Sequence, residues 1–322
     1  MMPEESPAGG AVHDAPSSPG VFAAAATETV PGAGSTTASK DIGRLTIQCA
    51  DQPGIVAAVA GFLAEHGANI VELGQFSTDS ENGEFFQRTV FHREGLAEAL
   101  PGLSAAFAAQ VGERFGMTFT LTNAATPKRV AIMVSKYDHC LLELLWRNRR
   151  NELDMNVTMV ISNHPDLAAD VASFGIDFVH IPISRATKAE SEARALELLA
   201  GKVDLVVMAR YMQILSADFL ENVGCPVINI HHSFLPAFAG AGPYLKAKER
   251  GVKLIGATAH YATATLDEGP IIEQDVVRVS HRDSVAELER RGAEVERSVL
   301  ARAVQWHCED RVMTYRNSTT IL

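Results

Sequence analysis

From residue 129 onward, short apolar segments alternate with segments of helical periodicity. The apolar segments are rich in Val, Ile and Leu along their whole length, so both faces of each strand must be covered. Helices that alternate with such strands cover the two faces of a parallel sheet. The pattern therefore predicts an α/β fold built on a doubly wound, mostly parallel sheet. The expected strands are 129–135, 157–162, 178–181 and 205–209, and the expected helices are 141–150, 166–174 and 188–199.

Two later apolar segments, 227–231 and 254–262, are also predicted strands, and both carry polar residues. Ser284 and Glu287 form a capping-box pattern. This pattern predicts the start of a long amphipathic helix. We expect the helix to reach about His307 and to pack across the sheet. Ligands of doubly wound sheets bind outside the carboxyl ends of the strands. The polar residues at those ends are therefore the first candidates for a site.

The residues before this sheet predict a separate small domain. Asp51-Gln-Pro-Gly54 ends a β-branched strand, and Gly67 ends the helix that follows. A turn at 79–83 then separates two strands, and a second helix leads to a last strand. The order βαββαβ is typical of a ferredoxin-like domain. Its expected strands are 44–49, 69–76, 84–92 and 115–121, and its expected helices begin at 55 and span 96–111.

Shifts in composition divide the chain into three regions. Residues 1–42 are rich in Ala, Gly, Pro, Ser and Thr, and they lack the basic cluster and apolar core of a secretory signal. Such a segment buries too little apolar surface to fold, which predicts a disordered low-complexity tail. The polar stretch 122–128 separates the two folded parts. We therefore expect the tail at 1–42, the ferredoxin-like domain at 43–123 and the sheet domain at 124–322.

Charge and cysteine usage exclude several classes of function. The formal net charge is −11 at pH 7, and such an acidic surface repels nucleic-acid phosphates. No apolar run approaches the ~20 residues that a bilayer-spanning helix requires. The four cysteines include no CxxC pair, which fits reduced thiols in a cytoplasmic protein. We expect no nucleic-acid partner, no membrane partner, no metal and no cofactor.

Two polar groups at predicted strand ends are candidates for chemistry. In Asn229-Ile-His231, strand alternation places an amide and an imidazole on one face, where they could polarise a carbonyl and move a proton. Side chains that only satisfy loop backbone would give the same pattern. Asp267 stands before a Gly-Pro turn and could equally cap its own backbone. Taken singly, neither group decides between a functional and a structural role.

Together, these groups resemble the active-site signature of the folate-dependent formyltransferase superfamily. The matching residues are Asn229-Ile-His231 with Ser233 and Leu235-Pro236, then His260, then Leu266-Asp267-x-Gly-Pro270. The run from Leu205 to Ser216 resembles the folate-pocket strand and loop of that superfamily. The resemblance covers about residues 129–322. It implies that Asn229, His231 and Asp267 act on the formyl group of 10-formyltetrahydrofolate.

The small front domain resembles an ACT domain, a module that senses amino acids and pairs subunits. The resemblance rests on Asp51-Gln-Pro-Gly54 and on Gly67-Ala-Asn69-Ile70 within the βαββαβ order. It implies an amino-acid effector and a homo-oligomer. The implied regulatory residues are Asp51, Gln52, Pro53, Gly54 and Asn69.

Three features favour a hydrolase within the formyltransferase superfamily. An ACT domain precedes the sheet domain, and His232 stands where transferase relatives usually have proline. The loop 135–140 also lacks the glycines with which transferase relatives hold a phosphorylated acceptor. The implied reaction is hydrolysis of 10-formyltetrahydrofolate to formate and tetrahydrofolate, which supplies formate for purine synthesis. Formyl transfer to an amine acceptor, and an amino-acid-binding regulator with an inactive back half, stay open as alternatives.

The resemblance also implies a role for each site residue. Asn229 would donate to the oxyanion, and His231 would be a second donor or general acid. Asp267 would orient water and bias His231 towards its charged form, with His260 positioning Asp267 or touching the substrate directly. His232 would restrict the acceptor side. The pterin would bind backbone groups of the loop formed by Met212, Gln213, Ile214 and Leu215.

Two departures from the superfamily pattern concern substrate affinity. Gly242 stands where relatives often have a basic residue, and Ala262-Thr-Ala-Thr265 lacks the polar or acidic residues usual in that loop. The first could weaken contact with the folate tail, and the second could alter the pterin loop.

Overall fold

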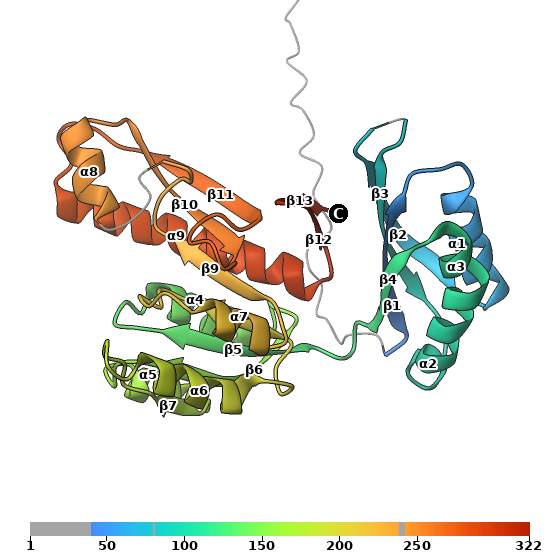
Figure 1. Ribbon diagram of the computed structural model, residues 1–322, viewed down its shortest axis with the longest axis horizontal. Helices are drawn as coiled ribbons and strands as arrows, with labels where there is room; N and C mark the ends of the chain where they lie inside the picture. Colours follow the sequence, from blue (N-terminus) through green and yellow to red (C-terminus); the bar gives the residue numbers. More distant parts are fainter. Residues whose placement is uncertain (1–39, 80, 238–241) are drawn as a thin grey trace, which may run out of the picture. The chain divides into compact units, whose positions relative to one another are not determined.

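The computed structural model describes residues 40–79, 81–237 and 242–322 (Figure 1). The predicted tail lies outside the described residues except for its last three positions. There, Ile42 already pairs with His92 of a neighbouring strand and accepts a hydrogen bond from the Ala124 amide at 2.9 Å. The first strand therefore begins earlier than expected. No helix among the described residues is long and apolar enough to cross a bilayer.

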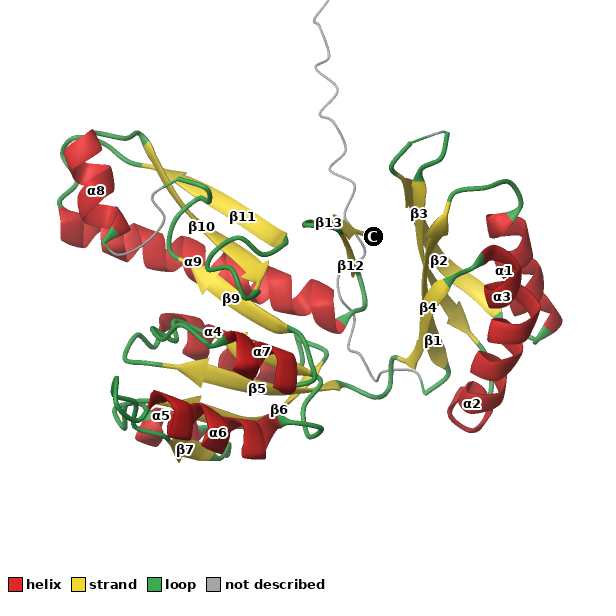
Figure 2. Cartoon of the chain, viewed as in Figure 1, coloured by secondary structure: helices red, strands yellow, loops and turns green. Residues whose placement is uncertain are grey.

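The first sheet is antiparallel and has four strands in the order β2-β3-β1-β4. Figure 2 shows its helices packed on one face. Buried apolar side chains from both layers form one core, so the βαββαβ prediction is confirmed. The elements are β1 (Ile42–Ala50), α1 (Ile55–Glu65), β2 (Asn69–Ser77), β3 (Glu84–His92), α2 (Leu96–Phe107) and β4 (Thr118–Asn123).

The end of the second helix differs from the prediction. Phe115 was expected in the last strand, but the chain stays helical through a π-helical turn at Ala108–Gly112 and a short helix α3 at Glu113–Phe115. Phe115 is buried in the core from the helical side. Gly116, with φ 61°, ends the helix, and β4 begins only at Thr118. Apolar residues beside a turn fit either period, which explains the misplacement.

The second sheet has seven strands in the order β11-β10-β9-β8-β5-β6-β7. The strands from β7 to β9 pair in parallel, whereas β10 and β11 are antiparallel, so the prediction of a mostly parallel sheet is confirmed. The parallel part comprises β5 (Lys128–Val134), α4 (His139–Arg149), β6 (Met155–Ser162), α5 (Ala168–Ser173), β7 (Phe178–His180), α6 (Lys188–Leu199), β8 (Leu205–Met208), α7 (Ala217–Asn222) and β9 (Val227–His231). The remaining elements are α8 (Pro243–Arg250), β10 (Leu254–Tyr261), β11 (Ile271–Arg278), α9 (Val285–Cys308), β12 (Val312–Tyr315) and β13 (Ser318–Ile321).

Both faces of this sheet are buried, as its central strand demonstrates. In β5, Val130 and Ile132 belong to a core shared with α4 and α9, whereas Ala131 and Met133 belong to one shared with α6 and α7. The helix α9 begins as expected, because the hydroxyl of its N-cap Ser284 accepts from the Glu287 amide. Its apolar stripe lies in the same core as β9 and β10. The short helices α7 and α8 and the strands β11, β12 and β13 were not predicted.

We expect one histidine to make the stability of this core dependent on pH. Nδ1 of His307, on α9, lies 2.8 Å from the hydroxyl of Tyr261, on β10. Burial lowers the pKa of His307 to about 4, and unfolding returns it to ~6.5. Its neutral form therefore supports stability above pH ~6.5, and that support is lost as the pH falls towards 4. We predict a loss of up to about 3 kcal/mol in the free energy of unfolding over this interval.

Urea unfolding at several pH values tests this prediction. In His307→Asn, the Asn side chain can still bond Tyr261 but has no proton to gain. The free energy of unfolding should therefore fall less on acidification in this variant than in the wild type, and the difference is the contribution of His307. Equal losses in the two proteins would contradict the assignment.

Candidate active site

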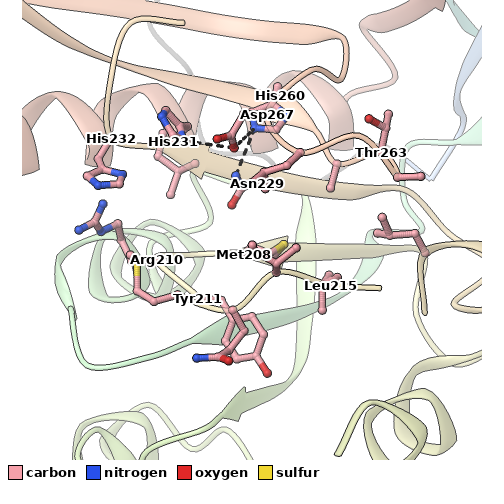
Figure 3. Close-up of a pocket in the computed structure, with 18 of the residues that line it drawn as sticks. Met208, Arg210, Tyr211, Leu215, Asn229, His231, His232, His260, Thr263 and Asp267 are labelled. Carbon is pink, nitrogen blue, oxygen red and sulfur yellow. Dashed lines mark hydrogen bonds and ion pairs between the residues drawn. The ribbon is translucent and has the colours of Figure 1, made fainter. Parts of the chain in front are cut away.

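A cavity of ≈ 330 Å³ lies where the carboxyl ends of β8 and β9 meet the loop after β10 (Figure 3). Three of the four predicted catalytic side chains come from strand ends around it, and the fourth comes from that loop. The position agrees with the general rule for ligands of doubly wound sheets. Its lining includes Met208, Arg210 to Leu215, Asn229, His231, His232, Gly242, His260, Thr263, Leu266 and Asp267.

Strand pairing places Asn229 against His260. The two residues are register partners between the antiparallel strands β9 and β10, and Nδ2 of Asn229 lies 3.2 Å from Nε2 of His260. The other ring nitrogen of His260 lies 2.9 Å from the carbonyl oxygen of Tyr261 and must donate to it. Nε2 is then an acceptor, so His260 fixes the Asn229 amide with one N–H left for a ligand. His260 was expected to position Asp267 or to touch the substrate. Its Nε2 lies 4.0 Å from the Asp267 carboxylate and 3.2 Å from the Asn229 amide.

Asp267 reaches the cavity from a strained turn. Its φ is 58°, a left-handed conformation that typically costs ~1 kcal/mol or more for a residue other than glycine. Gly269 permits the turn, because a Cβ there would collide with the carbonyl of Tyr261. The turn brings Oδ1 of Asp267 to 3.3 Å from Nδ1 of His231. The Asp-x-Gly spacing therefore has a structural cause and aims the carboxylate at His231.

The surroundings of His231 favour its neutral form. Burial lowers its pKa, and the nearby charge of Asp267 only partly opposes that effect. Asp267 thus raises the pKa of His231, as expected, but the effect of burial is larger. With Nδ1 facing the carboxylate, Nε2 is left as the basic nitrogen. Nε2 is buried and has no hydrogen-bond partner among the described residues, so it is available to a bound water or substrate.

The lowered pKa of His231 predicts the acid side of the pH–rate profile. Because protonation of Nε2 removes a base, kcat/KM should fall with pH only below ~6.5, the ordinary histidine value. The residual activity of Asp267→Asn should decline at still lower pH, because the carboxylate that raises the pKa is gone. A steady-state profile in both proteins checks this. An acid limb at or above pH ~6.5 in the wild type would contradict it.

The predicted folate loop forms one wall of the cavity. Met212 and Ile214 line it with 49% and 60% of their surface exposed, which leaves apolar area for a flat ring. The Met212 amide donates to the Ser135 hydroxyl at 3.0 Å, and Ser135 donates to Asn163 at 2.7 Å. That amide is therefore occupied, so a pterin can use only the remaining backbone groups of the loop. Leu215 lines the same wall, and Thr263 and Leu266 line the cavity from the loop after β10.

Comparison with known proteins decides the family. The family model for formyl transferases matches residues 128–304, and the ACT domain model matches 43–106. A protein of Mycobacterium tuberculosis named formyltetrahydrofolate deformylase is 63% identical over 281 residues, which are 87% of this chain and 91% of that protein. This chain belongs to the formyltetrahydrofolate deformylase family.

Other deformylases agree with this assignment. The formyltetrahydrofolate deformylase of Escherichia coli is 40% identical over 279 residues, covering 85% of this chain and 96% of that protein. A crystal structure of a deformylase from Pseudomonas syringae matches with a TM-score of 0.85 at 45% identity, over 89% of this chain and 96% of that one. A glycinamide ribonucleotide transformylase from Symbiobacterium toebii matches with a TM-score of 0.57 at 32% identity, over 61% of this chain.

A buried cluster beside the deformylase cavity was not foreseen. Glu296 on α9, only 1% exposed, accepts from the Tyr244 hydroxyl at 2.6 Å and lies 2.8 Å from Nε2 of His139. Oε2 of Glu296, the oxygen beside His139, also lies 3.4 Å from Nε of Arg210. Burial alone would raise the pKa of Glu296, but His139 and Arg210 overcome it and hold the pKa at about 2. The sequence did contain one sign of this cluster: Glu296 interrupts the apolar stripe of the amphipathic helix α9.

Cys140 joins this cluster without making it a convincing metal centre. The ligand atoms of His139, Cys140 and Glu296 lie within 4.8 Å of one another. However, both Glu296 oxygens already have partners, one of them near the Arg210 cation. Burial also raises the pKa of the Cys140 thiol well above its usual value, which disfavours the thiolate a metal needs. The donor set therefore fits a hydrogen-bonded cluster better than a cation.

His232 stands between this cluster and the catalytic residues. Its ring centroid lies 5.2 Å from that of His231 and 6.1 Å from that of Tyr244. Burial, with the charge of Arg210, lowers the pKa of His232 to about 4. His232 therefore presents a neutral ring to the end of the cavity.

A second cavity, of ≈ 410 Å³, lies in the ACT domain. Three of the five predicted regulatory residues line it, namely Asp51, Gln52 and Gly54. Pro53 and Asn69 do not. The first turn of α1 and Gln75, Ser77 and Phe85 complete the lining. The Ser77 hydroxyl donates to the Asp51 carboxylate, which fixes an acidic group at the cavity.

Proposed function

We propose that the protein hydrolyses 10-formyltetrahydrofolate with water to formate and tetrahydrofolate. One observation carries the catalytic part. The amide of Asn229, the free Nε2 of His231 and the carboxylate of Asp267 meet in a single cavity beside an apolar wall. Membership of the deformylase family supports the same reaction.

The geometry supports a division of labour among these residues. The formyl oxygen accepts the N–H of Asn229 that His260 leaves free, so charge developing on that oxygen is stabilised. Nε2 of His231 takes a proton from water while the water oxygen bonds to the formyl carbon. Asp267 stabilises the imidazolium through Nδ1. The carbon–N10 bond then breaks, His231 returns the proton to N10, and formic acid loses its proton to leave as formate.

An assay without an acceptor tests the reaction. Purified protein with 10-formyltetrahydrofolate should release formate and tetrahydrofolate in equal amounts, at a rate that added amines do not change. A rate that requires an amine would support formyl transfer instead. No turnover of either kind, with an intact fold, would support an inactive regulator.

The broader biological role is also a proposal. Formate released by this reaction can supply purine synthesis and rebalance one-carbon folate pools. The cysteines Cys49, Cys140, Cys225 and Cys308 are unpaired, which supports the expectation of a reducing, cytoplasmic compartment.

We propose that the ACT-domain cavity binds a free amino acid. The N-terminus of α1 leaves amides of Ile55, Val56 and Ala57 outside the helical ladder, and such groups suit a carboxylate. Asp51 suits the ammonium group. A homo-oligomer formed through this domain remains part of the proposal and is tested by the mass of the full chain in solution.

Titration of single amino acids against formate release tests the effector. A coupling of ~1–3 kcal/mol would change the apparent affinity for one ligand by about 5- to 150-fold. Asp51→Asn should abolish the response, whereas Asp79→Asn, at an exposed acid outside the cavity, should retain it. A response that survives Asp51→Asn would place the effector elsewhere.

A further inference from the structure

Arg210 is a buried cation that the proposed hydrolysis does not use. It follows β8, lines the catalytic cavity and is only 7% exposed. Its φ of 62° places it in the left-handed region, which is strained for an arginine and is typical of functional positions. Its carbonyl accepts a long hydrogen bond, 3.3 Å, from the Ser135 amide. The backbone therefore holds this side chain at the edge of the cavity.

The guanidinium of Arg210 is poorly satisfied. Nε and Nη1 are buried and have no hydrogen-bond partner within the described ranges. Glu296 is the carboxylate paired with Arg210, at 3.4 Å from Nε, but its oxygens are engaged by His139 and Tyr244. The guanidinium carbon also lies 4.8 Å from the centroid of the Tyr137 ring, but the face of a ring is not a hydrogen-bond acceptor of the kind that a carboxylate oxygen is. Buried donors normally find an acceptor, so an additional acceptor is expected at this end of the cavity.

The surroundings of Arg210 define which acceptor fits. In Figure 3 the guanidinium lies at the same end of the cavity as His232. The charge of Arg210, with burial as the larger cause, lowers the pKa of His232 and so favours its neutral ring. A neutral imidazole can donate one N–H, and a guanidinium presents a planar fork. This combination suits a small planar anion with two oxygens.

We propose that Arg210, with His232, forms a binding site for formate or another small monocarboxylate. The proposal rests on the proposed function to the extent that hydrolysis generates formate in this cavity. Glu296 already balances the charge of Arg210, so binding should be weak. Weak binding is what a product site requires, because the anion must leave before the next turnover.

Binding of ¹³C-formate to the folate-free protein tests the site without any turnover. The broadening of the formate NMR signal, titrated with formate, should give a saturable affinity in the wild type, and nitrate should compete. Arg210→Gln alone would leave Glu296 buried without its cation and could destabilise the fold. The main variant is therefore the double substitution Arg210→Gln with Glu296→Gln. Loss of a charge-assisted contact should weaken formate about 10-fold or more. Arg210→Lys keeps the charge but not the fork and should also weaken it.

Arg129→Gln is the matched control. Arg129 is 47% exposed, pairs with Asp204 and does not line the cavity, so formate affinity should not change. Absence of saturable binding in the wild type, or equal affinity in the wild type and a folded double variant, overturns the proposal. Because the titration needs no folate, Arg210-dependent binding without formate release would refute the proposed hydrolysis but not the anion site. Formate release without Arg210-dependent binding would refute the site alone.

Discussion

Replacement of Asn229 by alanine should lower kcat for formate release about 100- to 1,000-fold, the usual cost of one lost oxyanion donor. The fold should persist, because among the described residues the side chain bonds only His260, and it faces the cavity. His231→Ala and Asp267→Ala should each cost at least ~100-fold, since they remove the base and the group that stabilises its charged form. Rates at saturating 10-formyltetrahydrofolate, with circular dichroism as the check on folding, measure these effects.

Two further variants make this result specific. Asn222→Ala removes an exposed amide that bonds Asp218 on α7, and it should leave kcat unchanged. Asp267→Asn keeps the shape of the side chain but removes its charge, so it should lose most of the activity. A folded Asp267→Asn variant with full turnover would refute the electrostatic role of this carboxylate.

The sequence predicted the parts of the site that a single strand or turn determines. Alternation along β9 placed Asn229 and His231 on one face, and that relation needs no knowledge of neighbouring strands. The partner of His260 could not be predicted, because it depends on the antiparallel register of β10 against β9. A shift of one residue would have turned His260 to the other face.

The buried cluster was missed for a related reason. Arg210 and Glu296 lie far apart in the sequence and meet only because α9 packs on the sheet beside the end of β8. In the ACT domain, the residues proposed from the turn that do line the cavity are Asp51, Gln52 and Gly54. Asn69, the first residue of β2, does not line it.

Glu296→Ala should be the most destabilising single substitution in the buried cluster. It leaves Arg210 without a carboxylate and the Tyr244 hydroxyl without its acceptor, both in the interior. Removing one partner of a buried ion pair typically costs about 3–5 kcal/mol. Urea unfolding at pH 7 should show a loss of this size. Glu294→Ala, two residues away on α9, removes an exposed carboxylate paired with Arg290 and should cost about 1 kcal/mol or less.

A second comparison separates an unpaired charge from lost packing. Adding Arg210→Gln to Glu296→Gln removes both ions together, so the double variant should be more stable than Glu296→Ala even though it loses more native contacts. If Glu296→Ala and Glu294→Ala were equally stable, Arg210 would have to find another acceptor in the folded protein. Since its Nε and Nη1 have no other partner among the described residues, that acceptor would have to be water admitted from the catalytic cavity. The cluster would then be a hydrated part of the active site. The charge of Arg210 would in that case affect catalysis rather than the free energy of unfolding.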